Sequence, residues 1–71
     1  MSKWKRTCEA AKNDPVLVGI ATSIVAANRA GNPDRAAYAA FTDRVKERGL
    51  FVPNRAYYTL LIGSCLSLYR A

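Results

Sequence analysis

The chain contains no histidine, only two cysteines, and five acidic residues against eleven lysines and arginines, so its formal net charge is +6. Histidine is the commonest metal ligand and the commonest general base near neutral pH, so both roles lack their usual residue. Two cysteines alone do not complete a structural zinc site. The sequence also has no glycine-rich phosphate loop. We expect no metal, no cofactor and no enzymatic activity.

The two cysteines, Cys8 and Cys65, lie near opposite ends of the chain. They could form a disulfide if the first and last helices were adjacent. Cytosolic proteins rarely keep disulfides, and a buried cysteine packs as a small hydrophobic side chain. We therefore expect both to be packing residues.

Acidic residues are scarce, and none follows Glu47, so the last third of the chain is basic and apolar together. The excess positive charge is spread along the sequence. A nucleic-acid arm or a polybasic anchor would gather it in one run. A basic balance of this kind favours acidic partners, whether nucleic acid, anionic lipid or an acidic protein surface.

Long apolar runs are also missing, because the stretch from Val16 to Ala27 falls short of the roughly 20 residues that span a membrane. Basic residues before this stretch give some likeness to a secretory leader, but Glu9, Asp14 and Gly19 interrupt that pattern. We expect a cytoplasmic protein, and a membrane is not an expected partner.

Clear signals for helix starts are present. In Asp14-Pro15 an N-cap residue precedes a proline at the first helical position, and Asn32-Pro33 repeats this arrangement. Together with two helix-ending glycines and the N-cap candidate Asn54, these signals predict helices over about 2–12, 15–30, 33–48 and 54–70. We expect a single all-α domain over residues 1–71, a small bundle of three to four helices with mostly antiparallel neighbours.

Two of these helices are apolar around most of their circumference, and such helices must be buried on most sides. Because so short a chain offers little interior, we expect a homodimer formed through the apolar helices. Small residues recur at spacings of four, which permits close helix approach: Gly19, Ser23, Thr59, Gly63 and Ser67. These faces could instead pack together within one chain, and sequence periodicity does not separate the two arrangements.

An arginine–aromatic cluster is the first candidate binding site. It consists of Arg44, Arg48, Phe51, Arg55 and Tyr57, and aromatic anchors among arginines are typical of protein interface hot spots. Phe51 could alternatively close the end of the bundle. The cluster favours another protein as the partner.

The N-terminal run Lys3, Trp4, Lys5 and Arg6 is the second candidate. Cations that hold phosphates beside an indole that stacks on a base are typical of single-strand binding, and the same group suits a lipid headgroup boundary. The alternative is a tryptophan that packs on the core with solvated charges around it.

Two other patterns are weak. The Gly31 turn suggests a helix-turn-helix, but the second helix would begin Asp34-Arg35-Ala36-Ala37. An aspartate facing phosphates is unfavourable, and alanines make few contacts to base edges.

Asp43 and Glu47 are expected to be solvated ion-pair partners on a charged helix.

No resemblance to a known family is apparent. Size and composition are of a kind common among phage and mobile-element accessory proteins. We expect a non-enzymatic module that docks on a larger protein and regulates or inhibits it. The alternatives are a basic DNA- or RNA-binding protein, and third a membrane-surface-active protein.

Overall fold

The computed structural model describes residues 2–68, and within them the protein is all-α. The helices are α1 (Lys3–Lys12), α2 (Pro15–Arg29), α3 (Arg35–Glu47) and α4 (Tyr57–Cys65). None of the helices in this range is long and apolar enough to cross a membrane. The predicted all-α helical fold is confirmed.

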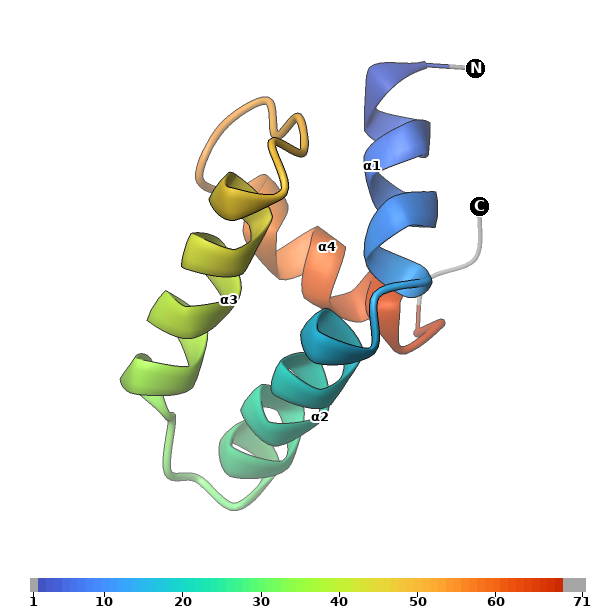
Figure 1. The fold of residues 1–71 in the computed structure, drawn as a ribbon. Coiled ribbons are helices and arrows are strands. Elements are labelled where there is room, and N and C mark those ends of the chain that lie inside the picture. Colours follow the sequence, from blue (N-terminus) through green and yellow to red (C-terminus); the bar gives the residue numbers. More distant parts are fainter. Residues whose placement is uncertain (1, 69–71) are drawn as a thin grey trace.

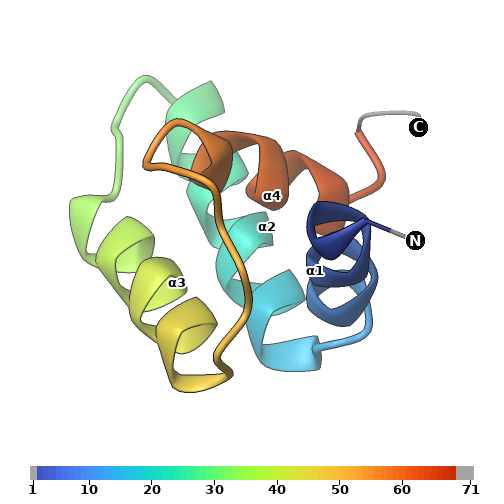
Figure 2. The same cartoon turned by 90° about the horizontal axis from the view of Figure 1, so that it is seen from above.

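The helix α2 lies at the centre of the arrangement and contacts each of the other three, while α1 also contacts α4. Figure 1 shows that α2 and α3 lie side by side and run in opposite directions. Seen from above, α4 crosses over α2 towards α1 (Figure 2). The expectation of mostly antiparallel neighbours therefore describes the α2–α3 hairpin, whereas α4 is a crossing helix.

Side-chain caps fix where three helices begin. Ser2 accepts a hydrogen bond from the Lys5 amide, Asp14 from the Val16 and Leu17 amides, and Asp34 from the Ala37 amide. The predicted start of α3 at residue 33 is wrong, because Asp34 caps this helix and leaves the preceding Asn-Pro pair outside it.

The described helices α2, α3 and α4 end in the same way. Each is followed by a residue in the left-handed conformation, and the amide of the next residue donates a hydrogen bond to the carbonyl five positions before it. Gly31 (φ 72°) and Gly49 (φ 64°) follow α2 and α3, and Ser67 (φ 56°) follows α4. In α4 the Leu68 amide donates to the Gly63 carbonyl, which is the Schellman pattern. A serine thus occupies the position that glycine fills in the two earlier helices.

The last helix is shorter than the predicted range of 54–70. Asn54 was the expected N-cap, but its Oδ1 accepts from the Ala56 amide in a turn, and α4 starts only at Tyr57. At the other end the Ser67 turn stops the helix after Cys65. Residues 69 and 70 of the predicted helix lie outside the described residues.

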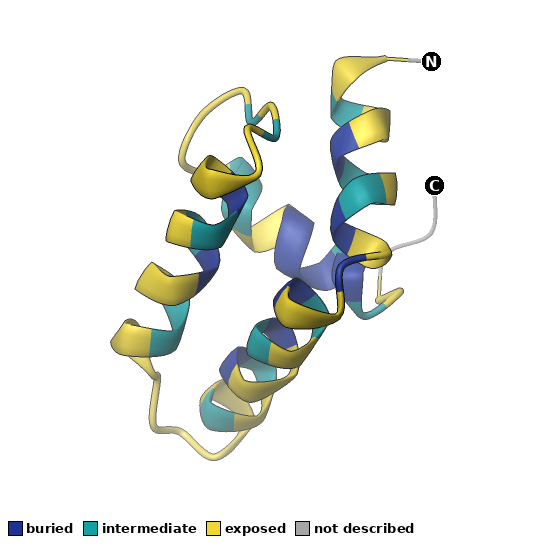
Figure 3. Cartoon of the chain, in the orientation of Figure 1, coloured by how far each residue is buried: buried dark blue, intermediate teal, exposed yellow. Residues whose placement is uncertain are grey.

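All four described helices contribute buried residues to a shared core, shown in dark blue in Figure 3. In α4 three consecutive residues, Leu61, Ile62 and Gly63, are buried, so more than one side of this helix is covered. The buried apolar residues are Ala11, Leu17, Ala21, Ile24, Phe41, Val45, Leu61, Ile62 and Cys65. The opposite face of α2 stays at the surface, and Val16 is half exposed. Although α2 is apolar around most of its circumference, only one side of it is buried within the chain.

Both cysteines are free thiols, and Cys65 is buried. Burial, together with the nearby Cys8 and Asp14, raises the pKa of the Cys65 thiol to about 11. Cys65 is therefore protonated at neutral pH and packs in the core as a small apolar group.

Asp14 joins the start of α2 to the end of α3. Only 3% of the residue is exposed. Its Oδ1 caps α2, accepting from the Val16 amide at 2.9 Å. Its Oδ2 accepts from Arg44 Nε at 3.2 Å and from Arg48 Nη1 at 2.8 Å. One buried carboxylate thus satisfies a helix terminus and holds two guanidinium groups of the neighbouring helix.

The protonation of Asp14 follows from this geometry. Burial raises the pKa of the carboxyl, but hydrogen bonds from Arg48, the Leu17 amide, Arg44 and the Val16 amide outweigh burial and lower the pKa from 3.8 to about 2. Because the folded pKa is depressed, the charged form stabilises the fold above pH 3.8. This contribution is lost as the pH falls from about 4 to about 2.

We predict that Asp14→Asn lowers the free energy of unfolding by about 2 kcal/mol near neutral pH. Asparagine can still cap α2, so the loss reports the two charged hydrogen bonds to arginine. Urea unfolding followed by circular dichroism measures it. The gap between the two proteins should narrow as the pH falls from about 4 to about 2.

Asp34→Asn is the matched control, because Asp34 also caps a helix but is exposed, and no arginine of the described residues is hydrogen-bonded to it. Asparagine and aspartate cap almost equally well, so this variant should change stability by less than about 0.5 kcal/mol. Equal losses in the two variants would contradict a special role for Asp14.

Candidate functional site

Aromatic side chains of the segment 51–57 lie beside the first turn of α1. The Trp4 and Tyr57 rings pack edge to face, with centroids 5.0 Å apart and planes at 78°. Lys3 Nζ lies 5.7 Å from the centre of the Phe51 ring. We call Lys3, Trp4, Phe51 and Tyr57 the aromatic surface. It combines residues from both predicted sites, although they are about 50 positions apart in sequence.

The loop carrying Phe51 is tied to α1 by a buried threonine. The Thr7 hydroxyl donates to the Phe51 carbonyl at 2.6 Å, and the Lys3 carbonyl lies at 3.1 Å as a second acceptor. Thr7 itself is only 3% exposed, whereas Phe51 is 44% exposed. The backbone of Phe51 is therefore held in place while its ring faces solvent, and it does not plug the bundle end as a core residue.

Arg44 and Arg48 were predicted to belong to the same cluster as Phe51. The structure directs both guanidinium groups to Asp14, and Arg44 Nη1 also lies 3.8 Å from Glu47 Oε2. Their contacts thus hold α3 against α2. The sequence gives no signal for this, because the partner carboxylate is at least 30 positions away.

Lys5 and Arg6 are exposed and do not contribute to the aromatic surface. At about 100° per residue they lie about 100° and 200° around α1 from Trp4. Lys3 and Thr7 lie on the side that meets Phe51. The N-terminal run is therefore divided between two sides of the helix.

The small residues do not form one continuous face. Gly19 and Ser23 are exposed on α2, and a Cβ added at Gly19 would meet nothing within 4 Å. In and after α4, Thr59 and Ser67 are exposed but Gly63 is buried. Close packing of Gly19 against α4 within one chain is therefore wrong, and the small-residue face of α2 points to solvent.

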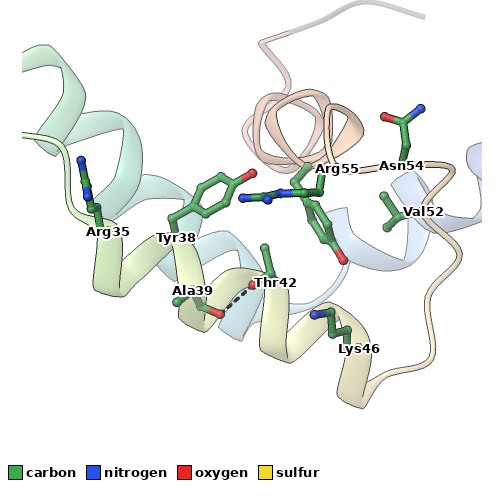
Figure 4. Close-up of a pocket in the computed structure, with 9 residues that line it drawn as sticks. Arg35, Tyr38, Ala39, Thr42, Lys46, Val52, Asn54 and Arg55 are labelled. Atoms are coloured by element: carbon green, nitrogen blue, oxygen red, sulfur yellow. Dashed lines mark hydrogen bonds between the residues drawn. The ribbon is translucent and has the colours of Figure 1, made fainter.

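A groove of about 550 Å³ lies between α3 and the segment 52–58 (Figure 4). Arg35, Tyr38 and Lys46 line one wall from α3, and Arg55 and Tyr58 line the other. Arg55, predicted as part of the aromatic cluster, belongs to this groove. The α3 residues recur on one helix face, a pattern visible in the sequence. Their juxtaposition with Arg55 depends on the path of the loop.

Comparison with known proteins finds no matching family model, no matching curated protein and no matching solved structure. A helical bundle is an architecture that hosts many unrelated functions. The features of this chain that bear on function are therefore the aromatic surface, the groove and their charges.

We predict that Thr7→Val loosens the loop that carries Phe51. Valine keeps the shape of threonine but removes the hydroxyl, which costs about 1 kcal/mol of local stability. Trypsin should therefore cleave after Arg55 about five-fold faster in this variant. Mass spectrometry of the timed digest measures the rate.

Thr22→Val is the control, because the exposed Thr22 hydroxyl donates only to the Val18 carbonyl of its own helix. Cleavage after Arg55 should be unchanged in this variant. An equal acceleration in both variants would mean that Thr7 does not hold the loop.

Proposed function

We propose that this chain is a non-enzymatic protein-binding module that docks on a larger protein through the aromatic surface and regulates or inhibits it. The observation that carries the proposal is Phe51, a large apolar ring exposed on a backbone that Thr7 holds in place. An ordered, exposed ring loses little conformational freedom when a partner covers it, so binding is less costly.

The neighbours of Phe51 support the same proposal. Trp4 and Tyr57 are half-buried and support each other by their edge-to-face contact. Tryptophan, tyrosine and phenylalanine are enriched in protein interfaces, and a few such side chains carry most of the binding free energy. The Lys3 ammonium above Phe51 adds a charge at the rim of the surface.

Nucleic-acid binding is the second candidate, favoured by the net charge of +6 and the basic groove. The N-terminal run supports it weakly, because the Trp4 ring is in contact with Tyr57 and two of the three cations point elsewhere. Binding of this kind would weaken steeply with salt, since each neutralised phosphate releases counterions.

We predict that the tagged protein retains one stoichiometric protein partner from a bacterial lysate after a high-salt wash and nuclease treatment. Phe51→Ala should reduce its recovery at least about ten-fold, the effect expected for a hot-spot aromatic residue. Gel densitometry of the eluted fractions measures the recovery.

Leu60→Ala is the matched control, because Leu60 is 42% exposed on α4 and lies outside the aromatic surface. It should leave recovery unchanged. Equal loss in both variants would contradict docking through Phe51. Loss of all bound material with nuclease would favour the nucleic-acid function instead.

We also propose that the chain forms a homodimer, and the exposed face of α2 supports this. Gly19 and Ser23 leave space for a second backbone, and Val16 adds exposed apolar area beside them. Small residues at such spacing permit two helices to approach closely. Small chains often gain stability in this way.

We predict that light scattering gives twice the mass of one chain over a wide concentration range, and that Gly19→Leu gives the mass of one chain. A leucine at Gly19 has room within the chain and favours the helix, so the fold should persist. Ala36→Leu, at an exposed position on α3, should leave the dimer intact. A monomeric wild-type protein would refute the dimer.

A further inference from the structure

The helix α3 carries cations on two opposite flanks. Arg44 and Arg48 lie on one flank and bind Asp14. Arg35 and Lys46 lie about half a turn away and line the groove. Among residues 2–68, neither of these two has a carboxylate within ion-pair distance. The groove cations are therefore available for an external anion.

The opposite wall adds a third cation. Arg55 extends from the loop towards α3, and its guanidinium group points towards the Tyr38 ring (Figure 4). Within the described range 2–68, no aspartate or glutamate lines the groove. The acidic residues of α3 and its N-cap are not among the lining residues. Asp34 caps the helix, Asp43 is exposed, and Glu47 approaches Arg44. A concave surface of one charge sign attracts ligands of the opposite sign.

The other lining groups indicate what kind of anion fits. Tyr38, Tyr58 and Thr42 supply hydroxyl groups, and Val52 supplies apolar contact. Arginine guanidinium groups bind carboxylates through two parallel hydrogen bonds. The distance along α3 from Arg35 to Lys46 is about 16 Å, at about 1.5 Å per residue. An extended peptide of about five residues has this length.

We propose that the groove between α3 and the segment 52–58 binds a short acidic segment of the partner protein. Side-chain carboxylates of the segment pair with Arg35, Lys46 and Arg55. This inference rests on the proposed function, because it assigns a part of the same partner to a second surface.

The first two residues of α4 link this groove to the aromatic surface. Tyr57 and Tyr58 are consecutive, yet Tyr57 packs on Trp4 while Tyr58 lines the groove. A protein that covers Phe51 and Tyr57 therefore reaches the groove by crossing one turn of chain. This continuity favours a protein segment over a separate nucleic-acid ligand.

The test is fluorescence anisotropy with a labelled peptide of about six glutamates, compared with an oligothymidylate of equal charge. The groove variant combines Arg35→Gln and Arg55→Gln. The control combines Lys5→Gln and Arg6→Gln, which removes the same charge from exposed positions on α1. Circular dichroism verifies that both variants keep the wild-type fold.

We expect the wild-type protein to bind the peptide and the groove variant to bind it about five-fold more weakly, about what two exposed ion pairs contribute. The control should lose less than about two-fold, because its residues lie outside the groove. Three results would overturn the proposal: no peptide binding at low salt, equal loss in both variants, or groove-dependent preference for the oligothymidylate. The assay uses no lysate partner, so its failure is distinguishable from failure of the Phe51 result.

Discussion

The carboxylate of Asp14 is the contact on which the arrangement of this protein depends. It caps α2 with one oxygen and holds Arg44 and Arg48 of α3 with the other. Because α3 is fixed against α2 along this flank, its other flank faces the loop and forms a wall of the groove. The buried charge is compensated because four N–H groups donate to the carboxylate, two of them from positively charged guanidinium groups. The same contact thus orders the core and leaves other cations free.

The helical class was predictable because apolar stripes and helix-start signals are local. Asp14 and Pro15 begin α2 as a short-range pattern indicates, and Gly31 follows it in the left-handed conformation. The errors in the predicted bounds of α4 also have local causes. Ser67 adopts the conformation that usually requires glycine, so the sequence carries no stop signal for α4. Asn54 forms a turn with the Ala56 amide instead of capping the helix.

The candidate site was predictable in its residue types and not in its assembly. Aromatic residues near Phe51 and near Trp4 are visible in the sequence, but their meeting depends on Thr7, which bonds a carbonyl 44 positions away. Whether an arginine of this region contacts the core or the groove depends in the same way on Asp14, a distant partner in sequence. Arg44 and Arg35 are both arginines of α3, yet Arg44 binds a buried carboxylate and Arg35 lines an open groove. Long-range contacts decide which cations a partner can reach.

We propose that the partner covers one continuous surface that runs from Phe51 across Tyr57 to Arg55. Hydrogen–deuterium exchange on the free chain and on its complex with the protein recovered from a lysate tests it most directly. We predict slower exchange on binding in residues 50–58 and in the first turn of α1, with the exposed face of α2 unchanged by the partner. Slower exchange confined to α2, or no change in residues 50–58, would contradict it.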